Sequence, residues 1–213
     1  MCGIVGVVSL NKQTKIDEEH IRQMLAMIRH RGPDEFGIYL DRFVGLGSAR
    51  LSIIDLSTGQ QPIPNEDESC WIVFNGEIFN YIELRAELET QGHRFRTQSD
   101  TEVILHCYEQ YGTDCLSHLN GQFALAIWDS NQQRLFCGRD RLGIRPLFYA
   151  ERDNTLLFGS EIKTLLSHPL IQPELEPQSL NQVFTFWTTL SPNTVFKDIF
   201  EVPPGYYLIA QDG

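Results

Sequence analysis

A cysteine at position 2 directly follows the initiator methionine and opens the apolar run of residues 1–8. If Met1 is removed, Cys2 becomes the first residue and carries a thiol and a free amine on the same carbon. A terminal amine has a pKa of roughly 7.7–8.0, so near neutrality part of it is unprotonated and can act as a base. This places a general base beside a nucleophile without any histidine. The alternative is a small buried residue that opens an edge strand, because free cysteine is among the most buried residue types.

The dipeptide Asn75-Gly76 directly follows the apolar segment 71–74. Attack of a thiol on an amide needs hydrogen-bond donors for the developing oxyanion. A side-chain amide and a glycine backbone N–H at a strand end can supply two such donors, and glycine permits close approach of a ligand. Asn-Gly is also the strongest short signal for a type I′ hairpin turn. A helical pattern rather than a return strand follows Glu77, which favours the donor interpretation.

Three charged residues have the types needed to hold the charged ends of a substrate, and each has an alternative interpretation. Arg50 ends a strand-like segment and can bind a carboxylate in bidentate fashion, or it makes a surface salt bridge. Asp100 lies in the first turn of a predicted helix, where it also favours the positive helix end. Glu77 either takes part in binding or only starts its helix.

Composition and charge describe an ordinary globular chain. Of its 213 residues, 42% are hydrophobic and 21% are charged, as is typical of soluble domains. The net charge of −11 argues against nucleic-acid or anionic-membrane binding, which requires a basic surface. No apolar run approaches the roughly 18 residues of a membrane span. The N-terminal apolar stretch has no positive region before it, so it indicates a strand rather than a signal peptide.

The cysteines and histidines carry little sign of cross-links or metal. The five cysteines are an odd number without a CxxC pair, and together with the missing signal this predicts reduced thiols in the cytoplasm. The six histidines are scattered, without HExxH or Cys/His ligand spacing. A metal site is therefore not indicated.

Hydrophobic periodicity predicts a mixture of helices and strands. Apolar residues at 21, 24, 25 and 28 mark one helical face, which ends before Gly32-Pro33. Similar faces predict helices over about 78–90 and from Ser99, where Ser99-x-x-Glu102 forms a capping box. Short helices are predicted at 161–167 and 179–186, and strands at 4–10, 36–40, 44–54, 71–74, 122–128, 134–138, 147–150 and 156–158. Because this order is not a regular βαβ alternation, the α+β class fits best.

The end of the chain has a different character from the rest. From about Ser191 the sequence, which contains Pro203-Pro204-Gly205, is typical of a connector. We therefore predict one domain over 1–190 and a connector over 191–213. Four aromatic residues near this boundary either form a docking surface for a further domain or belong to the core: Phe184, Phe186, Trp187 and Phe196.

Taken together, the motifs resemble the class II glutamine amidotransferase domain, and most closely the N-terminal half of glutamine-dependent asparagine synthetases. The resemblance spans nearly the whole chain. Its motifs are Met-Cys-Gly-Ile-Val-Gly at 1–6, Arg-His-Arg-Gly-Pro-Asp at 29–34, Arg-Leu-Ser-Ile-Ile-Asp-Leu at 50–56, Phe-Asn-Gly-Glu-Ile-Phe-Asn-Tyr at 74–81, Ser-Asp-Thr-Glu-Val-Ile at 99–104, Leu-Asn-Gly-Gln-Phe-Ala at 119–124, Gly-Arg-Asp-Arg-Leu-Gly-Ile-Arg-Pro-Leu at 138–147, Ser-Glu-Ile-Lys at 160–163 and Val-Pro-Pro-Gly-Tyr at 202–206.

This resemblance implies a fold and catalytic roles. The fold is a four-layer αββα sandwich of two mostly antiparallel sheets, of the N-terminal nucleophile hydrolase type. The implied reaction hydrolyses L-glutamine to glutamate and ammonia. Cys2 is the implied nucleophile, with its own amine as proton carrier, and Asn75 and the backbone N–H of Gly76 form the oxyanion hole.

The resemblance also implies a substrate-binding set. Arg50 holds the α-carboxylate of glutamine, and Glu77 and Asp100 take its α-ammonium group. The remaining implied members shape the pocket: Ile53, Arg31 and Asn80. The departures from the family pattern are small and touch none of these roles: Arg145 stands where lysine is common, and Ser48-Ala49 replace a more basic or histidine-containing pair.

The family pattern further implies a partner domain. No cofactor is expected in this domain, but ATP and magnesium are expected for a synthetase domain after residue 213, whose Ser-Gly-Gly-x-Asp-Ser loop does not occur in these residues. That domain transfers the ammonia to ATP-activated aspartate, and a homodimer is possible. Two rivals stay open: a glutaminase domain that serves a different acceptor, and a non-catalytic glutamine-binding module in which retained Met1 blocks Cys2.

Overall fold

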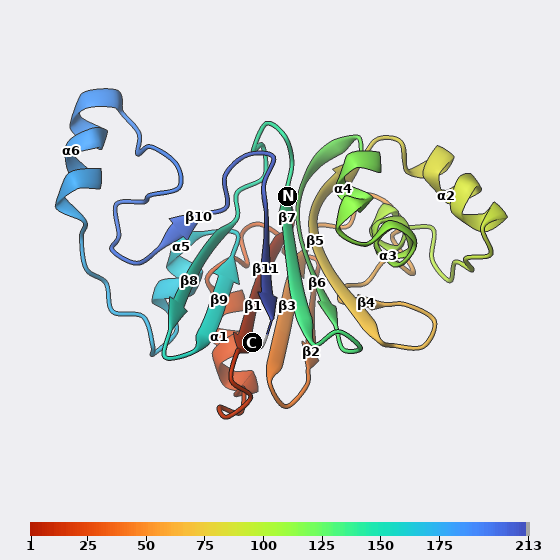
Figure 1. Cartoon of the computed structure of the whole chain (residues 1–213), viewed down its shortest axis with the longest axis horizontal. Helices are drawn as coiled ribbons and strands as arrows, with labels where there is room; N and C mark the ends of the chain where they lie inside the picture. Colours follow the sequence, from red (N-terminus) through yellow and green to blue (C-terminus); the bar gives the residue numbers. More distant parts are fainter. Residues whose placement is uncertain (212–213) are drawn as a thin grey trace.

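Two antiparallel sheets form the centre of the structure, a computed structural model that describes residues 1–211 (Figure 1). The strands are β1 (Gly3–Ser9), β2 (Glu35–Leu40), β3 (Val44–Arg50), β4 (Ile63–Pro64), β5 (Cys70–Ile78), β6 (Gly121–Asp129), β7 (Arg134–Arg139), β8 (Phe148–Arg152), β9 (Thr155–Gly159), β10 (Phe200–Glu201) and β11 (Tyr207–Gln211). One sheet has the order β10-β8-β9-β1-β3-β2, and the other has the order β11-β7-β6-β5-β4.

Helices cover the outer face of each sheet. The helices are α1 (Glu18–Ala26), α2 (Tyr81–Thr90), α3 (Asp100–Tyr111), α4 (Cys115–His118), α5 (Ile162–Leu166) and α6 (Pro177–Phe186), with a 3₁₀ turn at Gly112–Asp114. In Figure 1, α1 and α5 lie beside the first sheet, α2, α3 and α4 lie beside the second, and α6 lies at the periphery. The predicted α+β class and αββα sandwich are confirmed.

Three hydrophobic clusters explain the layers. Along β1, Ile4 and Val8 face the second sheet, whereas Val5 and Val7 face α1 and α5. Successive side chains of a strand point to opposite faces, so a central strand covered on both sides is a continuous apolar run. The same holds for β5, where Val73 faces the first sheet and its neighbours on either side face α3.

The helix starts follow side-chain capping. Asp17 accepts a hydrogen bond from the backbone of Glu19 at the start of α1. Ser99 caps α3 through Thr101 N at 3.2 Å. The predicted capping box is wrong in its second half, because the Glu102 carboxylate accepts from Thr97 N at 2.7 Å and thus holds the loop before the cap.

The largest correction concerns the segment around Asn75. The predicted strand 71–74 is the nine-residue β5, which pairs with β6 through Ile78. The helix expected from residue 78 therefore begins only at Tyr81. Both interpretations of Asn75-Gly76 need revision: the dipeptide is neither a strand end nor a hairpin turn but lies inside a paired strand, where cross-strand hydrogen bonds outweigh the local turn preference.

Two smaller differences concern the β3 region and the loop after it. The strand predicted over 44–54 ends at Arg50, and the loop predicted from residue 56 to 68 contains the short β4. A further difference is that the helix predicted to end before Gly32 already ends at Ala26, and turns occupy residues 27–31. The other predicted strands and helices agree with the structure to within two residues at each end.

The C-terminal segment takes part in both sheets. Strand β10 pairs with β8, and β11 pairs with β7. The division at residue 190 and the role of 191–213 as a connector stay predictions, and residues 212 and 213 lie outside the described residues. Helix α6 and the residues after it leave Phe184, Phe186 and Trp187 exposed, Trp187 by 92%. Phe196 instead packs against the hydrophobic cluster between α1 and the first sheet, as its core interpretation predicts.

Within residues 1–211, no helix has both the length and the apolar character needed to cross a membrane.

Candidate active site

A cavity at the start of β1 collects most of the predicted site residues. Its walls come from the chain start, the loop after β3, the strand β5, the first turn of α3 and the loop before β8. Seven of the nine predicted residues line it: Cys2, Arg50, Ile53, Asn75, Gly76, Glu77 and Asp100. Residues up to 98 positions apart in the chain therefore meet in one place.

Cys2 lies between the start of β1 and the loop after β3. Its Sγ is 3.4 Å from Leu51 N and 3.5 Å from Leu51 O. Burial raises the pKa of the Cys2 thiol above its ordinary value, while the Leu51 N–H, the terminal amine and Arg50 oppose this increase. The thiol is therefore protonated near neutrality and needs a base to become a nucleophile.

Asn75 presents a buried amide to the same cavity. Its side chain is 1% exposed, and neither Nδ2 nor Oδ1 has a hydrogen-bond partner among residues 1–211. A buried amide without a partner is costly, so an amide that lines a cavity suits a ligand that supplies the missing bond. Pairing of β5 with β6 holds the main chain of this residue in place.

Gly76 is required by packing as well as by the cavity. A Cβ atom at this position would lie 2.1 Å from Gln122 O on the paired strand. Only glycine permits this close approach of two backbones. Gly76 also lines the cavity beside Asn75.

Arg50 is a buried ion-pair partner and not a surface one. Its Nη1 donates to Glu35 Oε2 at 2.7 Å and to Ser52 Oγ at 3.1 Å. Its Nη2 donates to Ile54 O at 2.8 Å and to Asp55 O at 2.6 Å. The guanidinium therefore organises the loop that carries Ile53 into the cavity wall.

Asp100 and Glu77 provide negative charge on the opposite wall. Asp100 Oδ2 accepts a hydrogen bond from Ile78 N at 3.0 Å. Burial raises the pKa of the Asp100 carboxyl to about 6, and the charge of Glu77 adds to the increase. Glu77 lies within β5 and starts no helix. Asp100 lies in the first turn of α3, as predicted, and also lines the cavity, while its role in binding stays a prediction.

Arg31 and Asn80 lie outside the cavity. Arg31 Nε donates to Cys2 O at 2.9 Å, and its Nη1 donates to Glu161 at 3.0 Å. Asn80 bridges the start of α2 to the segment before β6, through His118 O at 3.0 Å and Asn120 N at 2.9 Å. Any influence of these two residues on the pocket is indirect, through the main chains that they hold.

Sequence reasoning missed Gln61, which lines the cavity and connects three elements of its wall. Its Oε1 accepts from Phe74 N at 2.7 Å, and its Nε2 donates to Thr101 Oγ1 at 3.2 Å. It also lies 3.4 Å from Ser48 Oγ of β3. Gln61 comes from a loop-like segment in which no periodicity marks it, so no sequence signal distinguishes it from the exposed Gln60 beside it.

Arg145 is the second missed residue, although it stands in a recognised motif. The sequence reasoning assigned it no role, but the structure places it in the cavity wall. Its Nη1 contacts Met1 Sδ, and its buried Nε has no partner within the described part of the chain. The buried Asp140 carboxylate fixes its loop by accepting from four backbone N–H groups, those of Phe123, Leu142, Ile144 and Arg145.

Two stacked antiparallel sheets between helical layers, with a cysteine at the head of a central strand beside a buried amide, define a protein of the N-terminal nucleophile hydrolase type. The model of the "Glutamine amidotransferase domain" family matches residues 1–213. The chain belongs to this family of glutamine amidotransferase domains.

Similar proteins agree with this assignment. "Asparagine synthetase [glutamine-hydrolyzing] 1" of Bacillus subtilis is 45% identical over all of this chain and 34% of its own length. "Amidase chry2" of Gibberella zeae is 39% identical over 99% of this chain and 32% of its own length. The chain thus spans about a third of the length of these relatives.

Solved structures support the fold alone. The glutamine phosphoribosylpyrophosphate amidotransferase of B. subtilis superposes with a TM-score of 0.70 at 21% identity, over 99% of this chain and 47% of that chain.

Proposed function

We propose that this domain hydrolyses L-glutamine to glutamate and ammonia through a thioester at Cys2. The observation that carries the proposal is the buried amide of Asn75, which lines the same cavity as the Cys2 thiol and lacks a partner among residues 1–211. A tetrahedral oxyanion formed by attack of the thiol supplies that partner.

The chemistry follows from the atoms around Cys2. Removal of Met1 frees the Cys2 amine, which takes the thiol proton as Sγ attacks the carboxamide carbon. Asn75 Nδ2 and the Gly76 N–H stabilise the oxyanion. Collapse of the intermediate breaks the C–N bond, and the departing nitrogen takes the proton from the amine to leave as ammonia. Water then attacks the thioester and releases glutamate and the thiol.

The charged walls are assigned to the two ends of the substrate. Glu77 and Asp100 bind the α-ammonium group, and Arg50 binds the α-carboxylate. The carboxylate of glutamine exchanges with one of the loop carbonyls that Arg50 Nη2 contacts, those of Ile54 and Asp55. Ile53 covers the site from the same loop, while Arg31 and Asn80 act through the main chain.

The test combines intact mass, labelling and turnover. We expect the active protein to lack Met1 and to be labelled at Cys2 by a glutamine-like electrophile. Cys2→Ala should abolish glutamate formation. Glutamate formation by Cys2→Ala at the rate of the parent would disprove the mechanism.

The acceptor of the ammonia is a further proposal. The B. subtilis relative, named as a glutamine-hydrolysing asparagine synthetase, supports asparagine synthesis as the fate of the ammonia. We assign the transfer to ATP-activated aspartate to a synthetase domain that uses ATP and magnesium. The relative named as an amidase supports the rival view that a similar domain serves a different acceptor. A complementation test distinguishes the two acceptors. If aspartate is the acceptor, an asparagine auxotroph that expresses a longer chain, with the synthetase domain included, should grow without added asparagine.

A non-catalytic binding module is the second candidate function. Met1 lines the cavity and its sulfur contacts Arg145, so a chain that keeps Met1 has a blocked nucleophile. Retained Met1 without labelling of Cys2 would favour this candidate.

The five cysteines are unpaired, which supports the cytoplasm as the proposed location.

A further inference from the structure

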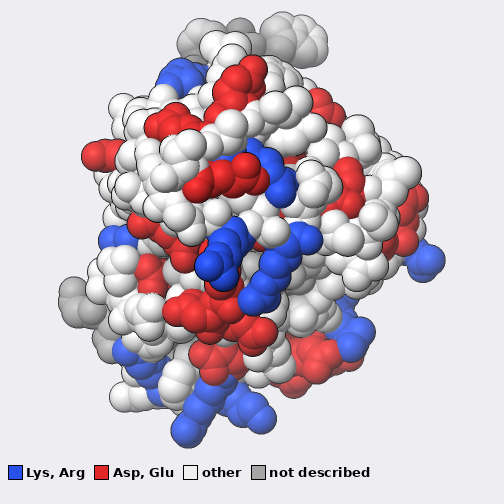
Figure 2. Space-filling model, turned by 90° about the vertical axis from the view of Figure 1, so that its right-hand side faces the viewer, with Lys and Arg blue, Asp and Glu red and all other residues white. Residues whose placement is uncertain are grey.

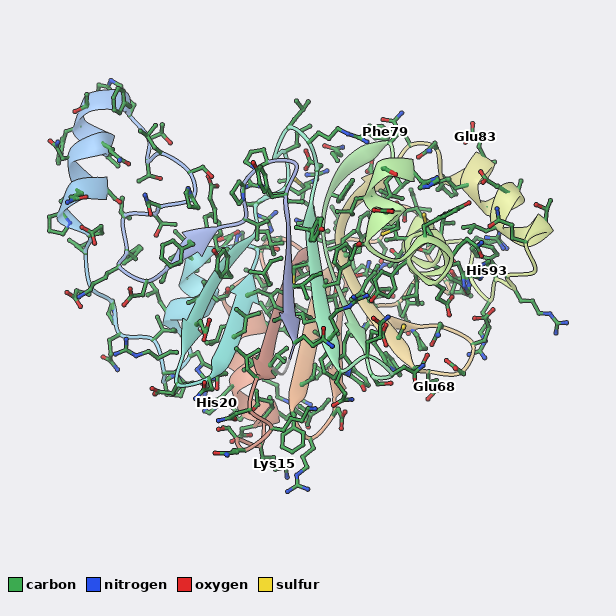
Figure 3. The ribbon with its side chains drawn as sticks, viewed as in Figure 1. Lys15, His20, Glu68, Phe79, Glu83 and His93 are labelled. Atoms are coloured by element: carbon green, nitrogen blue, oxygen red, sulfur yellow. The ribbon has the colours of Figure 1, made fainter. Side chains whose placement is uncertain are left out.

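The fold brings two histidines and two glutamates together on the outer side of α3, away from the cavity at Cys2. Glu66 follows β4, His93 follows α2, and His106 and Glu109 lie on α3. One ligand atom from each of Glu66, His93 and His106 lies within 4.8 Å of the others. Figure 3 labels His93 beside the end of α2. The sequence spacing of these histidines gave no sign of this cluster.

The orientation of the His106 ring is set from behind. The side chain is fully buried, and its Nε2 lies 3.6 Å from Glu102 Oε1. The Glu102 carboxylate is itself fixed by the backbone N–H groups of Arg96 and Thr97. The other ring nitrogen, Nδ1, faces the cluster and lies 2.6 Å from Glu109 Oε2 and 3.8 Å from Glu66 Oε2.

The ring of His93 repeats this arrangement. Its Nε2 lies 3.2 Å from Gln110 Oε1, and its Nδ1 lies 3.8 Å from Glu109 Oε2. Both rings thus have one nitrogen beside an acceptor and turn the other toward the carboxylate of Glu109. Histidines that bind metals have this second contact almost without exception, because it fixes the tautomer and the ring orientation.

We propose that Glu66, His93, His106 and Glu109 form a zinc site. Bonds of about 2.0–2.1 Å from zinc to nitrogen or oxygen place two tetrahedral ligands roughly 3.4 Å apart. The distance from His106 Nδ1 to Glu109 Oε2 is shorter than this value, at 2.6 Å. The distances from His106 Nδ1 to Glu66 Oε2 and from His93 Nδ1 to Glu109 Oε2 are longer, at 3.8 Å each. Two imidazoles with two carboxylates suit Zn²⁺ better than the all-oxygen sites of Mg²⁺ or Ca²⁺.

A general attraction of cations to an acidic surface does not account for this geometry. Figure 2, which views the molecule from the side of α2 and α3, shows acidic and basic side chains interspersed and no broad acidic patch. The competing occupant is a proton. Burial opposes a charge on His106, but the neighbouring carboxylates of Glu102 and Glu109 outweigh it and raise the pKa of His106 to about 9.

The site connects the β4–β5 turn, the segment after α2 and the middle of α3. Because α3 carries Asp100 in its first turn, zinc at this place stiffens a wall of the cavity from outside. The site is independent of glutamine hydrolysis, so either proposal can fail while the other stands.

The test measures zinc binding to the Cys2→Ala chain, because the free thiol of Cys2 can bind zinc separately from the proposed site. We expect one Zn²⁺ per chain in calorimetric titration with zinc chloride and in metal analysis after dialysis. His93→Gln and Glu66→Gln, which change residues at the surface side of the cluster, should each weaken binding by about tenfold or more. At one fixed excess of zinc, the melting temperature of the Cys2→Ala chain should rise more than that of its His93→Gln derivative.

His20→Gln is the matched control. His20 and His168 form a second histidine pair, edge to face with 4.7 Å between ring centroids. Among residues 1–211 this pair is not part of a cluster of metal-ligating groups, so the loss of His20 should leave zinc binding unchanged. The proposal is overturned if the Cys2→Ala chain binds no zinc at one equivalent. It is equally overturned if His93→Gln binds zinc as tightly as its parent, or if His20→Gln removes the binding. Circular dichroism establishes that each variant is folded.

Discussion

The carboxylate of Asp100 accepts a hydrogen bond from Ile78 N at 3.0 Å and thereby joins the first turn of α3 to the end of β5. The same carboxylate lines the cavity beside Glu77 and near Cys2. One buried group therefore has a structural contact and a proposed binding contact. Its pKa, raised to about 6 by burial and by Glu77, links the two.

The first prediction concerns the acid side of the activity profile. Only the ionised Asp100 carboxylate attracts the ammonium group of glutamine, so kcat/KM should fall by about tenfold from pH 7 to pH 5. Glu77, Cys2 and Arg50 line the same cavity as Asp100. They stay in place whether the Asp100 carboxyl is protonated or ionised. The initial rate at low glutamine, measured across this range, checks the prediction. Asp100→Asn should be slow at every pH, and an unchanged acid limb in this variant would assign the limb to another group.

The second prediction is that Asp100→Asn stabilises the folded chain at pH 7. A carboxyl whose folded pKa lies above its unfolded pKa binds its proton more tightly when folded, so its contribution to stability is lost as pH rises from about 4 to 6. Asparagine keeps an oxygen for Ile78 N and carries no charge. We expect the free energy of unfolding to rise by about 1–2 kcal/mol at pH 7. Denaturation at pH 4, where the parent is also uncharged, should show a much smaller difference.

The third prediction separates function from stability at Asn75. Its amide makes no hydrogen bond within residues 1–211, so Asn75→Ala loses no such bond in the unliganded state. Turnover should nevertheless fall by about 10²–10³, the usual effect of losing one oxyanion donor. Labelling of Cys2 by an electrophile that forms no oxyanion should be nearly unchanged. Equal losses of turnover and of this labelling would show instead that the substitution distorts the site.

The fourth prediction concerns Gln61, which lines the cavity and supports its wall through buried hydrogen bonds. Gln61→Leu leaves the buried N–H of Phe74 without its acceptor at 2.7 Å and breaks the contact to Thr101. An unsatisfied buried donor costs about 1–3 kcal/mol, so the free energy of unfolding should fall by this amount. Gln60→Leu, one residue earlier and exposed, is the control and should change it by less than about 0.5 kcal/mol. Equal effects in chemical denaturation would refute the assigned role of Gln61.

The contrast between Gln60 and Gln61 illustrates what the sequence can predict. Strands with apolar residues on both faces, such as β1, and helices with one apolar face, such as α1, are predicted because the periodicity is local. Asn75-Gly76 was misplaced within its strand, because the pairing of β5 with β6 comes from residues about 45 positions later. Local turn preference cannot report such a partner.

The candidate site divides in the same way. Residues whose chemistry is evident from type and motif, such as Cys2 and Asp100, were found in the sequence and meet in the cavity. Arg145 was overlooked because its place depends on the loop that Asp140 holds together. His93 and His106 seemed unrelated, because only the packing of α2 against α3 brings their rings to 5.0 Å.

The fifth prediction concerns Arg31, which holds the nucleophile by its main chain. Its Nε donates to Cys2 O at 2.9 Å, and its Nη1 pairs with Glu161. Arg31→Ala releases the residue that must attack, while the walls that bind the two ends of glutamine stay in place. Because a misplacement of about 1 Å can cost 10²-fold in rate, kcat should fall by about 10–100-fold with little change in KM.

Arg31→Lys, which keeps the charge and one donor, should recover part of the loss. Arg29→Ala, which removes an arginine over the Phe36 ring, should leave kcat unchanged. A rise in KM with unchanged kcat would instead place Arg31 in direct contact with the substrate.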